Sequence, residues 1–280
     1  MKISDEGQSW EKAVGDVNNV IQTSIKAINK KDKNLKNSNK EKISKWWQQI
    51  QKWREKNSLG FINSNETIKP QHAVQRLYEL TKNQDTFITT EVGQHQMWAA
   101  QHYKFDKPNR WMTSGGLGTM GYGLPAAVGV QIAHPDKLVI DIAGEASVLM
   151  TMQDMSTAVQ YNLPIKIFIL NNQYMGMVRQ WQELLHEKNY SESYSEALPD
   201  FKKMAEAYGC KGIRVSDYVN LDEKIQEMID HKGPVIFDCH VDPGENCFPM
   251  IPSGKPHNQM ILGPSDQAEN KITGKGKSLV

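Results

Sequence analysis

The amino-acid sequence predicts an α/β fold in which helices cover both faces of a mostly parallel sheet. From residue 68 onward, short β-rich runs alternate with longer segments whose apolar residues recur at helical spacing. Such alternation is typical of parallel strands joined by crossover helices. In these sheets ligands bind beyond the carboxyl ends of the strands, so we expect the functional residues there.

The expected helices and strands follow from the spacing of apolar residues along the chain. Helices are expected where apolar residues share one helical face, and strands where a run is short and β-rich. The predicted helices are 71–80, 94–102, 120–133, 152–161, 177–185, 200–208 and 221–229, and the predicted strands are 86–90, 138–142, 165–170, 212–215 and 235–239.

The segment before this region has a different composition. Residues 27–65 are rich in Lys, Asn, Gln and Ser and lack the apolar blocks of a core, which predicts a linker. Ile43, Trp46, Trp47, Ile50 and Trp53 recur at helical spacing, so the linker carries one amphipathic helix with a packing face. The lysines between residues 26 and 56 are interrupted by acidic residues and lack interleaved aromatic residues for base stacking, so we interpret them as a solvated face.

Overall composition excludes several classes of function. A net charge of +1 argues against nucleic-acid binding along the whole chain. The three cysteines form no CxxC pair, so neither a disulfide framework nor a zinc site is indicated. Neither a signal-peptide core nor a membrane-spanning apolar run is found, and a cytoplasmic location is expected.

The most informative motif is Gly144-Glu145-Ala146-Ser147, which lies between an apolar strand and a helix. A turn of small residues lets the backbone approach an anion, and a carboxylate beside it can hold a divalent cation. Asn172 follows the next strand along the chain and supplies a neutral oxygen at the same edge of the sheet. Because Mg²⁺ prefers such oxygen ligands, the pattern predicts a site for a diphosphate and its metal ion.

This arrangement resembles the thiamin diphosphate signature, a Gly-Asp-Gly variant followed by a helix, a strand and Asn-Asn. Longer strings resemble the large catalytic subunit of acetolactate synthase. They are Glu91-Val92-Gly93-Gln94-His95-Gln96-Met97-Trp98-Ala99-Ala100-Gln101, Gly115-Gly116-Leu117-Gly118-Thr119-Met120-Gly121-Tyr122-Gly123-Leu124-Pro125, Asn171-Asn172-Gln173-Tyr174-Met175-Gly176-Met177-Val178-Arg179-Gln180-Trp181 and Met250-Ile251-Pro252-Ser253-Gly254. The resemblance implies a remnant of a central domain over 1–30, the linker over 31–66, a thiamin diphosphate-binding domain over 67–262 and a tail over 263–280.

The resemblance assigns the metal ligands and one part of the cofactor cradle. It implies that Glu145, Asn172 and the carbonyl of Tyr174 hold Mg²⁺. The family usually has Asp at the first position, and Glu is one methylene longer. The residues implied to bind the cofactor are Val92, Gly93, Gln94, His95, Gly118, Met120, Gly144, Glu145, Ala146, Ser147, Asn172, Tyr174, Gly176 and Met177.

Each of these positions also has a structural alternative. Ser147 could cap a helix, and His95 could be a core histidine. By resemblance, the Gly118 carbonyl accepts a hydrogen bond from the aminopyrimidine and Met120 supports the bend between the two rings, although methionine is also common core filler. Trp181 and Ser253 resemble residues of the substrate channel, and packing or turn roles are the alternatives.

The implied activity is decarboxylation of pyruvate and transfer of the hydroxyethyl unit to a second 2-keto acid, either pyruvate or 2-ketobutyrate. The products, 2-acetolactate and 2-aceto-2-hydroxybutyrate, belong to branched-chain amino acid biosynthesis. No catalytic side chain is located, because the family's activating glutamate lies on a pyrimidine-binding domain that the aligned region lacks. The resemblance also implies FAD in the full-length enzyme, a homodimer or tetramer formed through the missing domain, and a regulatory small subunit.

We therefore interpret the chain as the C-terminal part of a longer enzyme, which alone binds its cofactor weakly and turns over little. One alternative is a stand-alone diphosphate-binding subunit of a two-chain 2-oxoacid decarboxylase or oxidoreductase. Another is a non-catalytic binding module derived from such an enzyme.

Overall fold

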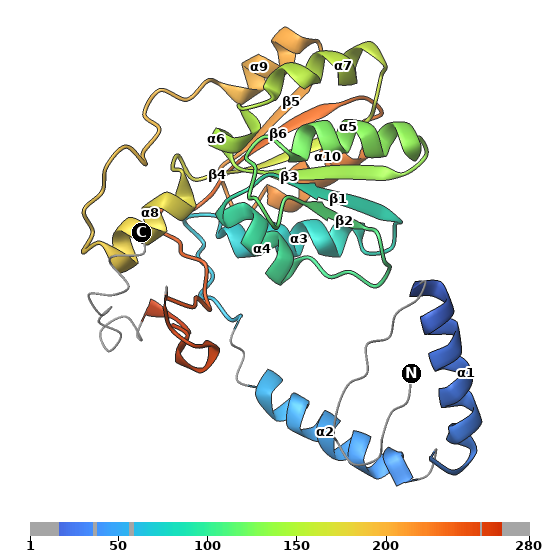
Figure 1. Cartoon of the computed structure of the whole chain (residues 1–280). Helices are drawn as coiled ribbons and strands as arrows, with labels where there is room; N and C mark the ends of the chain where they lie inside the picture. Colours follow the sequence, from blue (N-terminus) through green and yellow to red (C-terminus); the bar gives the residue numbers. More distant parts are fainter. Residues whose placement is uncertain (1–16, 36–37, 56–58, 253, 265–280) are drawn as a thin grey trace. The chain divides into compact units, whose positions relative to one another are not determined.

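A single parallel sheet organises the C-terminal part of the chain (Figure 1). The computed structural model describes residues 17–35, 38–55, 59–252 and 254–264. Within these ranges the strands are β1 (Thr86–Thr90), β2 (Trp111–Thr113), β3 (Leu138–Ala143), β4 (Lys166–Asn171), β5 (Lys211–Val215) and β6 (Val235–His240). They lie in the order β2-β1-β3-β4-β6-β5, and every neighbouring pair is parallel. The predicted α/β class with a mostly parallel sheet is confirmed.

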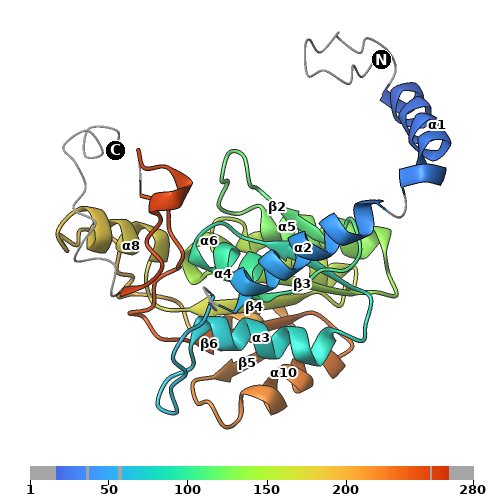
Figure 2. The same cartoon turned by 90° about the horizontal axis from the view of Figure 1, so that it is seen from below.

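Helices cover both faces of the sheet. The helices of this part are α3 (Pro70–Thr81), α4 (Gln94–His102), α5 (Gly123–Ala133), α6 (Glu145–Val148), α7 (Met155–Gln160), α8 (Gly176–Leu185), α9 (Phe201–Tyr208) and α10 (Leu221–Asp230), with 3₁₀ turns η1 (Met152–Asp154) and η2 (His257–Gln259). Figure 1 shows α7 and α9 on one side of the sheet and α3 and α4 on the other. In Figure 2, α3 and α10 lie side by side, and the ion pair between Arg76 and Asp222 joins them.

Alternation along the strands sends successive side chains into two separate cores. On β3, Val139 packs with α5, α7 and α9, whereas Ile140 and Ile142 pack with α3, α4 and α10. Because both faces are covered, β1, β3, β4 and β6 are buried at nearly every position.

The structure differs from the predicted elements at four places. The helix predicted over 120–133 begins only at Gly123, because Gly121 has φ +88°, which no α-helix tolerates. The helix predicted over 152–161 is a 3₁₀ turn followed by α7. Strand β2 and helix α6 are too short, at three and four residues, to produce a periodic pattern.

The chain divides into two units, residues 1–58 and residues 59–280. The first contains α1 (Val17–Leu35) and α2 (Ser38–Arg54). Helix α2 includes the predicted stripe, and Ile43, Trp46 and Trp47 are each at least half exposed. Helix α1 runs through residue 30, where the sequence suggested a boundary, and the domain limits stay a prediction. In the described ranges no helix has both the length and the apolar character needed to cross a membrane.

Strand order determines where a ligand site can form. The chain places β2 on one side of β1 and β3 on the other, so the progression of strands reverses between β1 and β3. At such a switch point the loops beyond the carboxyl ends diverge and leave a crevice. Residues 91–93, which lead into α4, and Gly144, which leads into α6, lie on its two sides.

Candidate functional site

A cavity of about 600 Å³ opens at the carboxyl ends of β1, β3 and β4. Its wall includes all of the predicted cofactor-binding residues and the predicted channel residue Trp181. The other predicted channel residue, Ser253, lies outside the described residues. Ten further residues line the cavity: Gln96, Met97, Trp98, Leu170, Met175, Val178, Gln180, Pro249, Met250 and Ile251. The fold thus brings segments that are more than 150 positions apart in the sequence around one space.

Glu145 is the acidic group of the cavity wall. It is the first residue of α6, separated from β3 by Gly144, and it is 1% exposed. Burial raises the pKa of its carboxyl to about 8, although backbone N–H groups of Glu145, Asn172 and Tyr174 oppose the shift. Its Oε1 atom has no hydrogen-bond partner. A buried carboxyl oxygen without a partner is costly, which is the condition expected where a cation binds.

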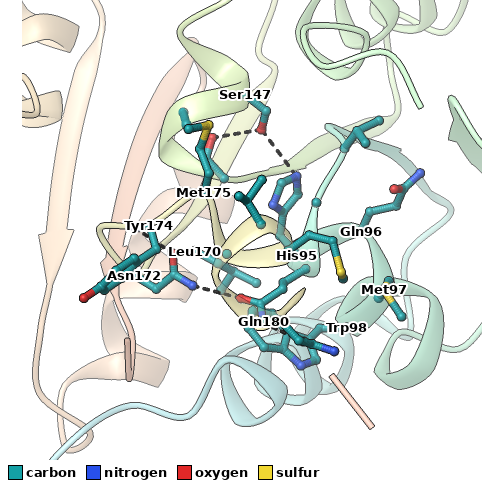
Figure 3. A pocket seen from close by; sticks show the side chains of 18 of the residues that line it. His95, Gln96, Met97, Trp98, Ser147, Leu170, Asn172, Tyr174, Met175 and Gln180 are labelled. Carbon is teal, nitrogen blue, oxygen red and sulfur yellow. Dashed lines mark hydrogen bonds between the residues drawn. The ribbon is translucent and has the colours of Figure 1, made fainter. Parts of the chain in front are cut away.

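His95 and Ser147 meet on one wall of the cavity. Figure 3 shows the His95 ring directed at Ser147, and the Nε2 and Oγ atoms are 3.4 Å apart. The same hydroxyl donates to the Gly144 carbonyl at 3.2 Å. A Cβ atom on Gly144 would lie 2.5 Å from Nδ1 of His95, so the ring can pack there only against glycine. Burial lowers the pKa of His95 to about 3, and the imidazole is therefore neutral at physiological pH.

A chain of buried amide side chains in the cavity wall links α4, α8 and the loop after β4. Nδ2 of Asn172 donates to Oε1 of Gln94 at 3.1 Å, and Nε2 of Gln94 donates to Oε1 of Gln180 at 2.8 Å. Gln180 also pairs with the backbone of Cys247. Oδ1 of Asn172 accepts the Tyr174 N–H at 3.2 Å and keeps a second lone pair for another ligand.

Sequence reasoning missed Gln180, which is completely buried. Glutamine is normally a surface residue, and nothing in its helix marks this one as buried. The only available signal was its place inside the string that carries the family resemblance. The apolar residues Met250 and Ile251 were quoted in a matching string without a role, and they form part of the cavity wall.

The donor set fits a hard divalent cation bound together with phosphate. Glu145 provides one carboxylate and Asn172 one amide oxygen, and both lie beside the backbone of Tyr174. Across the described residues no group of three or more His, Cys, Asp or Glu could hold a metal ion. A single carboxylate leaves coordination positions for phosphate oxygens and water, which is how Mg²⁺ commonly binds in nucleotide and phosphate sites.

Residues 91–239 match the family model described as thiamine pyrophosphate enzyme, C-terminal TPP binding domain. The match spans more than half of the chain, and the protein belongs to this family of thiamine pyrophosphate enzymes.

Within the family, the chain is similar to the C-terminal portion of acetolactate synthase large subunits. It is 42% identical over 258 residues to the acetolactate synthase large subunit of Haemophilus influenzae, covering 92% of this chain and 44% of the relative. It is 41% identical over 257 residues to the isozyme 3 large subunit of Escherichia coli, covering 91% and 44%. The large subunit of Porphyra purpurea is 44% identical over 252 residues, covering 89% and 41%. The predicted resemblance is confirmed, and the chain spans less than half the length of these curated relatives.

Proposed function

We propose that the cavity binds thiamin diphosphate through Mg²⁺, with Glu145, Asn172 and the Tyr174 carbonyl as the protein ligands. The observation that carries this proposal is the buried carboxyl of Glu145, whose Oε1 atom has no partner and which lies beside the backbone N–H groups of Asn172 and Tyr174. Gly144, Ala146 and Ser147 hold the diphosphate from one side, and Val92, Gly93, Gln94 and His95 hold it from the other. The neutral imidazole of His95 can donate one hydrogen bond there without adding charge.

The remaining wall of the cavity serves the rings of the cofactor. Gly118 accepts from the aminopyrimidine, and Met120 supports the angle between the rings. Gly176 and Met177 begin α8, which together with Trp181 excludes water from the reacting side. When bound, thiamin diphosphate supplies the chemistry of decarboxylation and carbon–carbon bond formation, while these residues bind and orient it.

We infer that the whole protein is an acetolactate synthase that converts two molecules of pyruvate to 2-acetolactate and carbon dioxide, or pyruvate and 2-ketobutyrate to 2-aceto-2-hydroxybutyrate and carbon dioxide. Its similarity to acetolactate synthase large subunits over about nine tenths of this chain supports this. The activating glutamate, the FAD site and the contacts that form the homodimer or tetramer belong to the part of the relatives that this chain does not cover. A small regulatory subunit is a further expected partner.

Cofactor binding is tested by titrating the chain with thiamin diphosphate at fixed Mg²⁺ and following tryptophan fluorescence, because Trp98 and Trp181 line the cavity. Glu145→Ala should weaken Mg²⁺-dependent binding at least about tenfold, since it removes the only charged ligand proposed. Glu206→Ala removes an exposed carboxylate of α9 and is the matched control. Equal affinity of wild type and Glu145→Ala across a Mg²⁺ titration would rule out the metal assignment.

The proposed reaction is tested by first sequencing the gene and then assaying its complete product. Sequencing upstream of the Met1 codon should show the reading frame continuing into a pyrimidine-binding domain with its glutamate. The complete product should then form 2-acetolactate from pyruvate. A genuine start site at Met1 would instead favour a two-chain enzyme, and absence of cofactor binding at millimolar concentration would favour a non-catalytic module.

A further inference from the structure

A buried carboxylate outside the proposed ligand set holds the glycine-rich segment 118–124. Glu91 directly follows β1, is 0% exposed, and was quoted in the sequence strings without a role. Its Oε2 atom accepts the N–H of Gly121, and its Oε1 atom accepts the N–H of Leu124 at 3.0 Å. This segment carries Gly118 and Met120 to the cavity wall.

The peptide groups on both sides of Gly121 are restrained. Its N–H is bound by Glu91, and its carbonyl accepts the Thr151 hydroxyl at 3.0 Å. Gly121 has φ +88° and Gly118 has φ +64°, both in the left-handed region that favours glycine. Glycines impose little preference of their own, so the conformation of this segment depends on the groups that bind its backbone.

The backbone at Gly123 packs so closely on the residues beneath it that it cannot move toward them. A Cβ atom on Gly123 would lie 2.2 Å from Oδ1 of Asp141 and 2.6 Å from the backbone nitrogen of Glu91. Asp141 lies on β3 and is completely buried, and its Oδ1 accepts the Thr89 hydroxyl at 3.1 Å. The first turn of α5 therefore rests directly on the ends of β1 and β3.

The neighbouring carboxyl groups of Glu91 and Asp141 have different surroundings. Burial and the adjacent Glu91 raise the pKa of Asp141 well above its usual range. Burial also raises the pKa of Glu91, but the backbone N–H groups of residues 121–124 oppose that shift. We assign the negative charge of the pair to Glu91, because several N–H donors point at it while Asp141 receives one hydroxyl.

We propose that Glu91 is a positioning residue, which sets the conformation of segment 118–124 and thereby the place of Gly118 and Met120 in the cavity. The consequence for binding rests on the proposed function, in which this segment faces the aminopyrimidine ring while residues 92–95 and 144–147 hold the diphosphate. Loss of Glu91 should then affect recognition of the rings and leave the diphosphate grip intact.

A first experiment needs no ligand. Hydrogen exchange of the backbone amides is compared in wild type and in Glu91→Gln, which keeps the shape of the side chain but loses the charge and one acceptor oxygen. The amides of Gly121 and Leu124 should exchange about tenfold faster or more, the scale expected for lost hydrogen bonds to a charged group. Amides of β4 should not change, and Glu91→Asp should give an intermediate rate. Unchanged exchange at Gly121 and Leu124 would overturn the proposal.

A second experiment compares two ligands by calorimetry, thiamin diphosphate and inorganic pyrophosphate, each with Mg²⁺. Glu91→Gln should raise the Kd of thiamin diphosphate about tenfold and leave that of pyrophosphate unchanged. Equal losses for both ligands, or no loss for either, contradict a positioning role. Failure of the wild type to bind either ligand would refute the proposed function, and the exchange experiment would still decide the role of Glu91.

Two further variants guard against simple destabilisation. Thr151→Val removes the second anchor of Gly121 and should reproduce the same pattern if Glu91→Gln does not fold. Thr81→Val removes a buried hydroxyl of α3 that bonds to the Leu77 carbonyl and does not line the cavity. It should lower stability without changing the ratio of the two dissociation constants, and a changed ratio would count against the specific role of Glu91.

Discussion

Two buried ionisable side chains, Lys166 and Glu145, lie at opposite ends of the parallel sheet and have different surroundings. At the amino end of β4, the ammonium of Lys166 is 1% exposed and donates to the carbonyls of His231 and Gly233, both at 2.7 Å. At the carboxyl end, the carboxyl of Glu145 is equally buried, and its Oε1 atom has no partner. The Lys166 ammonium thus has acceptors within the fold, whereas the Glu145 carboxyl keeps an open position that is suited to binding a ligand.

The largest effect on stability is expected at the amino end of β4, for substitution of Lys166. Lys166→Met leaves two carbonyl groups without donors and should lower the free energy of unfolding by about 3 kcal/mol. Urea denaturation at neutral pH measures the change, and Lys202→Met on the exposed face of α9 is the control. A loss no larger than that of the control would show that Lys166 does not stabilise the loop before β6.

The pH dependence of the same residue should be the next largest effect. Burial lowers the pKa of Lys166 to about 8 from an ordinary value of 10.5. Between these values the unfolded chain binds more protons than the folded chain, so the contribution of Lys166 to stability increases with pH. The free energy of unfolding of the wild type should rise by about 2 kcal/mol relative to Lys166→Met between pH 8 and 10.5. Parallel pH profiles of the two proteins would contradict the lowered pKa.

The smallest effect on stability is expected at the carboxyl end of the sheet, for substitution of Glu145. Its sign is opposite to that of the Lys166 substitution. In metal-free protein, Glu145→Gln removes a carboxyl that burial disfavours and should raise the free energy of unfolding by about 1 kcal/mol. Excess Mg²⁺ and pyrophosphate should reverse this order, because they stabilise only the protein that binds them. Thermal unfolding with and without the two ligands measures both changes, and Glu206→Gln is the control. Strong destabilisation of metal-free Glu145→Gln would mean that the carboxyl is structural.

The sequence could predict those site residues whose side chains suit a metal ion and which also follow a strand. Glu145 and Asn172 each follow a strand, and parallel strands bring their carboxyl ends to one edge, so local order was sufficient to group them. Gln180 lies inside a helix, and Glu91, although it also follows a strand, belongs to no motif that gives it a role, so neither was assigned. Their importance comes from burial against other segments, and neither glutamine nor glutamate has a pattern that reveals burial.

The sequence by itself determined the alternation of strands and helices and the family resemblance, which together indicated part of the cavity wall. These features depend on local periodicity and on short motifs, which are properties of neighbouring positions. Tertiary structure alone decided that β2 joins the sheet, that α5 begins at Gly123, and which buried polar groups are satisfied. Those outcomes depend on distances between segments far apart in the chain. The unpaired Oε1 atom of Glu145 and the hydrogen bonds of the Lys166 ammonium therefore exist only in the assembled sheet.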